Sequence, residues 1–75
     1  MIRQMDIVAL TRPLPEQGLE AGDTGTVVMV HAGGEGFEVE FVTLLGETVA
    51  VVTVPADAVR SLRQREIAHA RVLAG

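Results

Sequence analysis

The chain has 75 residues, which is the size of one small domain, and a formal net charge of −4. It has no cysteine, so it has neither a disulfide framework nor a thiolate metal site. Hydrophobic residues make up 48% of the sequence, which excludes the composition of a disordered chain. No apolar run is longer than Val49–Val52, far below the roughly 20 residues of a membrane-spanning helix, and we expect a cytoplasmic domain without a signal peptide.

Two short strands separated by a long loop are predicted in the first part of the chain. The apolar run within Asp6–Leu10 predicts the first strand, which ends before Pro13 and Pro15 because proline has no N–H to donate to a ladder. The loop that follows, Thr11–Asp23, is long for a hairpin connection. The β-branched run within Thr24–His31 predicts the second strand.

Strict alternation of apolar and acidic residues predicts the third strand. Within Gly36–Val42, the side chains of Phe37, Val39 and Phe41 fall on one face and two glutamates on the other, so both phenylalanines are expected in the core. The glycine-rich segment Ala32–Glu35 predicts a tight turn before this strand, because glycine tolerates positive φ.

The remaining sequence predicts two further strands and a helix. Thr48–Val54 is so rich in β-branched residues that a strand is favoured over a helix. Pro55–Ala58 has room for a single turn of 3₁₀ helix before a short fifth strand, Val59–Leu62. Good helix formers over Arg63–Leu73 predict a C-terminal α-helix that Gly75 is placed to stop. Its apolar stripe is thin, so the helix needs a surface to pack against.

This order of elements is similar to the SH3-like barrel, which has a long first loop, two tight hairpins and a 3₁₀ turn before the last strand. Two segments, Gly22–Val30 and Phe37–Phe41, together with Leu14–Pro15 and Val54–Ala56, resemble a pattern found in short bacterial domains of unknown function. The resemblance covers roughly residues 5–62. Some such domains stand beside toxin-like proteins, so the resemblance implies an accessory or antitoxin-like role.

The resemblance implies an all-β, five-stranded SH3-like barrel over residues 1–62 and leaves the C-terminal helix outside. We expect that helix, residues 63–75, to contact the same domain, a second copy or a partner. The glycine and valine pattern also resembles the KOW-type barrels of ribosomal and transcription-associated proteins. Those modules use basic and aromatic residues, whereas this chain has no Lys, Trp or Tyr, and it carries Glu38 and Glu40 on the outward face of the third strand.

Charge is distributed unevenly along the chain. Residues 1–59 carry nine acids against two arginines, a balance of −7, whereas residues 60–75 carry four arginines against one glutamate, a balance of +3. The acidic part repels phosphate backbones and attracts cationic partners, so nucleic-acid binding by the main body is disfavoured. The simpler interpretation is that the acids keep a valine-rich domain in solution.

No group of residues identifies a reaction. A proline-peptide groove or a methyl-lysine cage needs several aromatic side chains, and this chain has two phenylalanines, both expected in the core. His31 and His69, with Glu35 or Glu38 nearby, lack the spacing of a recognised metal or general-base site, and Ser61 has no local base. We therefore expect a protein that is not an enzyme and binds neither a cofactor nor a metal.

The long first loop and the C-terminal segment carry charged candidates for partner binding. Glu16, Glu20 and Asp23 lie where SH3 domains place acids that meet cationic peptides, and ordinary solvation is the alternative interpretation. On the predicted helix, Arg63 and Arg71 are the candidate basic contacts.

Alternation along the second and fourth strands predicts which apolar residues leave the core. The residues predicted to point inward are Val28, Val30, Val52 and Val54. Those predicted to point outward are Val27, Met29, Val49 and Val51. An uncovered apolar face is unusual on a monomer, so the C-terminal helix, a second copy or a partner should cover it.

The sequence thus predicts a non-catalytic protein-interaction module, accessory or antitoxin-like, that binds a protein partner or itself. The candidate partner-binding residues are Glu16, Glu20, Asp23, Met29, Val49, Val51, Arg63 and Arg71. The alternative function is a nucleic-acid-associated accessory factor that uses the arginine-rich C-terminal segment.

Overall fold

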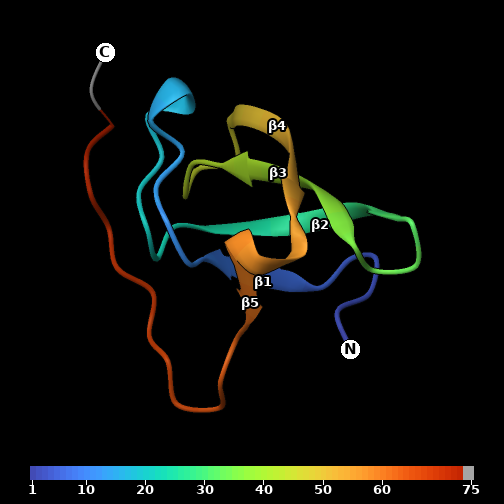
Figure 1. The fold of residues 1–75 in the computed structure, drawn as a ribbon. Helices are drawn as coiled ribbons and strands as arrows, with labels where there is room; N and C mark the ends of the chain where they lie inside the picture. Colours follow the sequence, from blue (N-terminus) through green and yellow to red (C-terminus); the bar gives the residue numbers. More distant parts are fainter. Residues whose placement is uncertain (74–75) are drawn as a thin grey trace.

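Five antiparallel strands form one strongly bent sheet in the computed structural model, which describes residues 1–73 (Figure 1). In chain order the strands are β1 (Ile7–Leu10), β2 (Thr24–His31), β3 (Gly36–Val42), β4 (Thr48–Pro55) and β5 (Val59–Ser61). Their hydrogen-bonded order is β4-β3-β2-β1-β5. The all-β prediction and the five predicted strands are confirmed. Within the described residues no ladder joins β4 to β5, so the sheet is not closed.

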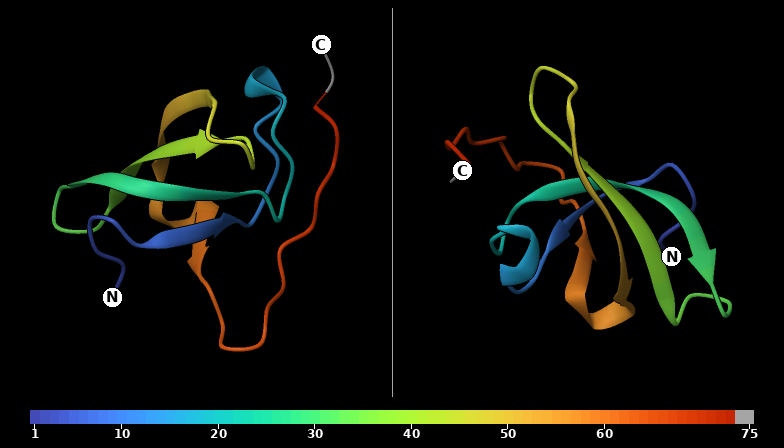
Figure 2. Two further views of the ribbon diagram at one scale, coloured as in Figure 1. Left: turned by 180° about the vertical axis from the view of Figure 1, so that it is seen from behind. Right: turned by 90° about the horizontal axis from the view of Figure 1, so that it is seen from above.

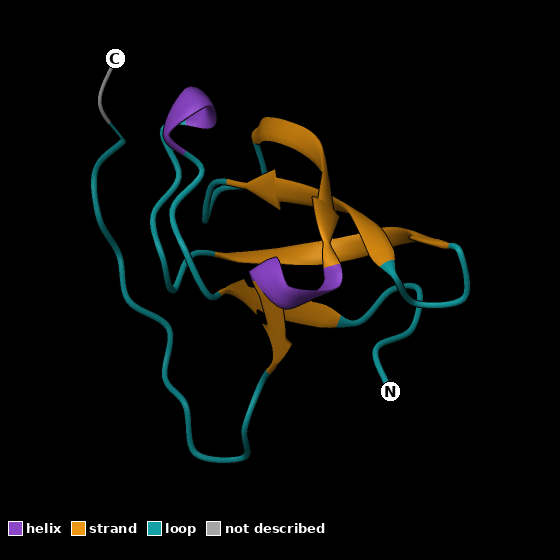
Figure 3. Ribbon diagram, in the orientation of Figure 1, coloured by secondary structure: helices purple, strands orange, loops and turns teal. Residues whose placement is uncertain are grey.

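Two single turns of 3₁₀ helix lie in the connections between strands (Figure 3). The first, η1 (Pro15–Gln17), lies in the long loop between β1 and β2, and the second, η2 (Ala56–Ala58), joins β4 to β5 as predicted. An α-helix is absent from residues 1–73, and no helix there has the length and apolar character needed to cross a bilayer.

The core lies inside the bend of the sheet and consists only of apolar side chains among the described residues. Its members are Val8, Ala9, Leu10, Leu19, Val27, Phe37, Val39, Phe41, Val54, Ala58 and Val59. Both phenylalanines point inward, as predicted, because β3 lies between β2 and β4 and turns its apolar face to the inside.

A register shift in β2 reverses the predicted side of Val27. The ladder pairs Val27 with Val39 and then Met29 with Glu38, so Val28 is an extra residue in β2. Val27 was predicted to point outward and is instead fully buried. Met29 lies on the outer face, as predicted. The inward prediction for Val28 is wrong, because the bulge leaves this residue outside the core cluster.

Val30 pairs with the buried Phe37 and so lies on the inner face, as predicted, but at the end of β2 it is partly exposed and outside the core. A second shift reverses the predicted side of Val49. The ladder pairs Phe41 with Ala50 and then Val42 with Thr48, so Val49 is the extra residue, and its side chain packs against the core. In the same strand Val52 packs against the core, Val54 is buried and Val51 is exposed, as predicted.

The predicted C-terminal helix is wrong. Arg63–Leu73 is irregular chain that leaves β5, turns and returns beside the loop between β1 and β2 (Figure 2). The Ile67 side chain, one of the few apolar side chains that could pack such a helix, is 94% exposed. A short helix without a packed face is marginal, and ion pairs at both ends of the segment hold the extended path instead. Gly75, the predicted helix stop, lies outside the described residues.

We expect Gly25→Ala to lower the free energy of unfolding by about 1–3 kcal/mol, because the added methyl overpacks the core. A Cβ at Gly25 would lie 2.6 Å from Val39 Cγ1 and 2.9 Å from the carbonyl oxygen of Glu40. Urea unfolding measures the change. Gly36→Ala is the graded control, because its Cβ meets only the Val54 carbonyl oxygen, at 3.3 Å. Equal stability of Gly25→Ala and the wild type would contradict this packing.

Candidate protein-binding site

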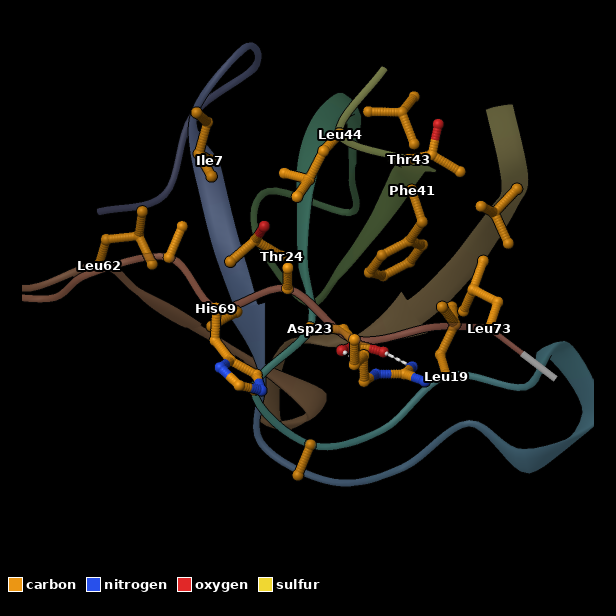
Figure 4. A pocket seen from close by; sticks show the side chains of 18 of the residues that line it. Ile7, Leu19, Asp23, Thr24, Phe41, Thr43, Leu44, Leu62, His69 and Leu73 are labelled. Carbon is orange, nitrogen blue, oxygen red and sulfur yellow. Dashed lines mark hydrogen bonds and ion pairs between the residues drawn. The ribbon is translucent and has the colours of Figure 1, made fainter. Parts of the chain in front are cut away.

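The C-terminal segment, residues 62–73, crosses one end of the sheet and is here called the strap. Its residues 62–70 are all exposed. Between the strap and the sheet lies a cleft of about 1100 Å³. In Figure 4 the Phe41 ring points into this cleft, and Asp23 lies beside the strap with a dashed bond to a guanidinium group. The strap therefore spans an apolar part of the sheet without filling the space beneath it.

An ion pair closes the turn where the strap leaves β5. Arg60 donates from Nη1 to Glu66 Oε2 at 2.8 Å and from Nη2 to Glu66 Oε1 at 2.6 Å. The backbone N–H of Arg63 donates to the same carboxylate. These hydrogen bonds, with that from Arg60 the largest cause, lower the pKa of Glu66 from 4.5 to about 2. The turn is thus held by a carboxylate that stays charged well into acid.

A second ion pair anchors the far end of the strap to the loop between β1 and β2. Arg71 donates from Nε to Asp23 Oδ1 at 3.0 Å and from Nη2 to Asp23 Oδ2. Nη2 also donates to the carbonyl oxygen of Gly18 at 3.3 Å, and Nη1 lies 3.6 Å from Glu20 Oε2. The hydrogen bond from Arg71 is the main reason that the pKa of Asp23 is lowered from 3.8.

The part of the loop that contacts Arg71, residues 18–23, is here called the arginine-binding loop. It keeps its shape through hydrogen bonds that do not involve the strap. The backbone N–H of Glu20 donates to Asp23 Oδ2 at 2.8 Å, which aims the carboxylate. Leu10 N–H donates to the Asp23 carbonyl at 2.9 Å, and Gly22 N–H donates to the Leu10 carbonyl at 2.8 Å, so the loop is tied to the end of β1. Gly22 adopts a φ of +92°, which favours glycine. Asp23 and Glu20 thus form a ready-made site for a guanidinium.

The lining of the cleft is mainly apolar. It includes Ile7, Leu19, Phe41 and Val49 from the sheet and the loop before β2, and Leu62 and Leu73 from the strap. Asp23, Thr24, Arg60 and His69 add polar groups at its edges. A concave, largely apolar surface with a few polar groups is typical of a binding site.

A set of exposed apolar side chains surrounds the cleft, and we call it the apolar rim. Its members are Val42, Leu44, Leu45, Leu62 and Ile67. Leu44 is 78% exposed and Leu45 is 99% exposed. They lie in the turn between β3 and β4, which is closed by hydrogen bonds from Thr43 N–H to the Glu47 carbonyl at 2.7 Å and from Glu47 N–H to Thr43 Oγ1 at 3.0 Å. The turn thus presents both leucines to solvent on a hydrogen-bonded support.

The residues predicted to bind a partner fall into separate groups. Glu20, Asp23 and Arg71 meet in one ionic cluster, a pairing that was not predicted from the sequence. Glu16 lies exposed on η1, and Arg63 contributes its backbone to the turn of the strap.

Met29 and Val51 lie on the outer face of the sheet on opposite sides of β3, paired with Glu38 and Glu40. Val49 instead lines the cleft. The apolar rim was missed, although its signal was two consecutive leucines before Gly46, between the third and fourth predicted strands.

The histidines lie apart from each other. His31 is the last residue of β2. Its Nε2 atom lies 3.6 Å from Glu38 Oε1, and this nitrogen has no hydrogen-bond partner. His69 lies on the strap at the edge of the cleft. Within residues 1–73, no three His, Asp or Glu side chains form a group that could hold a metal ion.

Comparison with known proteins assigns the sheet to a family. Residues 4–61 match the model of a family described as "Domain of unknown function (DUF4926)". The chain belongs to the DUF4926 family. No curated protein and no solved structure matches the chain. The predicted resemblance to a short domain of unknown function is confirmed at this level. The DUF4926 match ends at Ser61, the last residue of β5, so the arginine-binding loop lies inside it and the strap lies outside.

We expect acid to release the strap from this DUF4926 domain. Asp23 stays charged above its ordinary pKa of 3.8, and the ion pair with Arg71 is lost as the pH falls through the lowered pKa. Backbone ¹⁵N relaxation should show residues 67–73 becoming mobile over that range, and Arg71→Gln should show this mobility already at neutral pH. Arg65→Gln is the control. Identical relaxation of the Arg71→Gln variant and the wild type would disprove the anchor.

The carboxyl carbon of Glu66 should titrate with a midpoint of about 2 in an NMR pH series. Arg60→Met should raise this midpoint toward 4.5, because it removes the hydrogen bonds that favour the charged form. Arg65→Met, which changes an arginine of the same turn, should leave the midpoint near the wild-type value. A midpoint that does not respond to Arg60→Met would show that the pair is absent in solution.

Proposed function

We propose that this DUF4926 domain is a non-catalytic protein-interaction module with an accessory or antitoxin-like role, and that it docks a protein partner on the cleft and the apolar rim. The observation that carries the proposal is the exposure of Leu44 and Leu45 beside an apolar cleft. Contiguous exposed apolar surface on a small domain marks an interaction site. Fully burying one leucine contributes about 1.5–3 kcal/mol, so covering this pair alone supplies substantial binding free energy.

The charged groups around the cleft support a protein partner over a small ligand. The ion pair of Arg71 with Asp23 and that of Arg60 with Glu66 border the apolar surface. An apolar centre with a polar border is the usual composition of a protein interface. The strand order, with β5 beside β1 and η2 before it, supports an SH3-like arrangement of the sheet.

The alternative function, nucleic-acid binding through the arginine-rich segment, receives less support. Arg60 and Arg71 both form ion pairs with carboxylates of the same chain, so their charge is largely neutralised. The body they border carries a balance of −7 over residues 1–59. Phosphate binding depends on unneutralised positive charge, which this surface offers mainly at Arg63 and Arg65.

A matched pair of substitutions tests the docking surface. Leu45→Glu places a charge on the apolar rim, and Met29→Glu places one on the outer face of the sheet, at a side chain that is 49% exposed. With the full chain immobilised and cell extract of the source organism applied, Leu45→Glu should reduce capture of specific proteins by about tenfold or more, as measured by quantitative mass spectrometry. Met29→Glu should retain capture.

Thermal unfolding checks that both variants fold, which is expected because neither side chain belongs to the core. If Met29→Glu abolishes capture and Leu45→Glu does not, the partner binds the outer face and the proposed surface is wrong. Retention by both variants of every captured protein would also reject it.

A further inference from the structure

We infer that the occupant of the cleft is a second copy of this chain, which exchanges its strap so that Arg71 of each copy binds Asp23 and Glu20 of the other. The inference rests on the proposed function, because it names the partner of the same surface. The structure already contains the required contact within one chain. A second copy brings an identical strap to an identical site, so the same contacts can form between copies once the strap is released.

The receiving site is complete without its own strap. The Asp23 carboxylate is aimed by the backbone N–H of Glu20, and the loop is tied to β1 through Leu10. The carbonyl of Gly18, the third acceptor for the guanidinium, belongs to the same loop. A guanidinium that arrives from another molecule therefore meets the same three acceptors as Arg71 does now.

The strap is built to be separable from its own body. No residue of the strap belongs to the buried core, and the side chains of Ile67 and Val72 are each 94% exposed. The ion pair of Arg71 with Asp23 anchors its far end, and this pair can form equally between two copies. Extended chain covers about 3.3 Å per residue, so the segment from Ser61 to Arg71 can reach roughly 33 Å once the turn closed by Arg60 and Glu66 opens. That reach is comparable to the longest dimension of the molecule, 34 Å.

Strap exchange also accounts for the apolar side chains that a single copy leaves exposed to solvent. Within one chain the strap spans the cleft but leaves Leu45 and Ile67 in water. A two-fold exchange keeps the pair of Arg71 with Asp23 in each copy and sets the two cleft-bearing ends against each other, where the apolar rims can cover each other. At the contact itself the charges are complementary, since residues 60–75 carry +3 and residues 1–59 of the other copy carry −7. Each copy gives one strap and receives one, so the assembly closes as a dimer.

A charge exchange between two variants tests the inference. In Asp23→Arg the altered site repels its own Arg71, and in Arg71→Asp the altered strap is repelled by its own Asp23, so neither variant holds its strap alone. Mixed together, each strap finds a complementary site only on the other variant. Native mass spectrometry of an equimolar mixture, with one chain ¹⁵N-labelled, should show the heterodimer at least about tenfold above either homodimer.

The double variant Asp23→Arg/Arg71→Asp is the matched control, since it restores the pairing and should dimerise like the wild type. The wild type should show concentration-dependent dimerisation by light scattering. If Asp23→Arg does not fold, Ala21→Cys and Ala70→Cys provide a second test, because they flank the anchor in a chain that has no cysteine of its own. Mixed oxidation should then enrich the crosslinked heterodimer above the statistical ratio.

A strictly monomeric wild type, or a mixture that yields no heterodimer and no enriched crosslink, overturns strap exchange. These results are independent of the capture experiment with Leu45→Glu. If that variant still loses a captured protein while no heterodimer forms, the docking surface stands and only its assignment to a second copy is wrong.

Discussion

The apolar face of β3 is the constraint on which the rest of the structure depends. Phe37, Val39 and Phe41 are all buried, and β3 lies between β2 and β4, so these three side chains hold the bent sheet together from inside. The remaining core side chains are small or aliphatic, because the chain has only two aromatic residues. Phe41 stands at the end of this row and also forms part of the cleft, which links the core directly to the candidate site.

The strands could be predicted because their signals are local. Alternation over Gly36–Val42 and β-branched residues over Thr48–Val54 depend on a few neighbouring residues, and the structure has strands there. The sides of Val27 and Val49 could not be predicted, since each depends on a one-residue register shift against a neighbouring strand. Alternation within a single strand carries no information about such a shift.

The C-terminal segment was mispredicted for a related reason. Helix formers over Arg63–Leu73 describe a local preference, whereas the observed path is held by an ion pair between Arg71 and Asp23, 48 positions apart in the sequence. The split of charge between the two parts of the chain was visible in the sequence. In the structure, two ion pairs hold the basic strap against the otherwise acidic domain. These pairs depend on where the side chains lie, which composition alone cannot predict.

The division between body and strap has a consequence for how such a protein can change. Every buried apolar residue of the described chain lies at or before Val59, so substitutions in residues 62–73 leave the interior undisturbed. Related proteins can therefore carry C-terminal segments of different sequence while they retain the core and the loop that binds an arginine. Under the proposed function, substitutions within these dozen positions would change the choice of partner without changing how the domain folds.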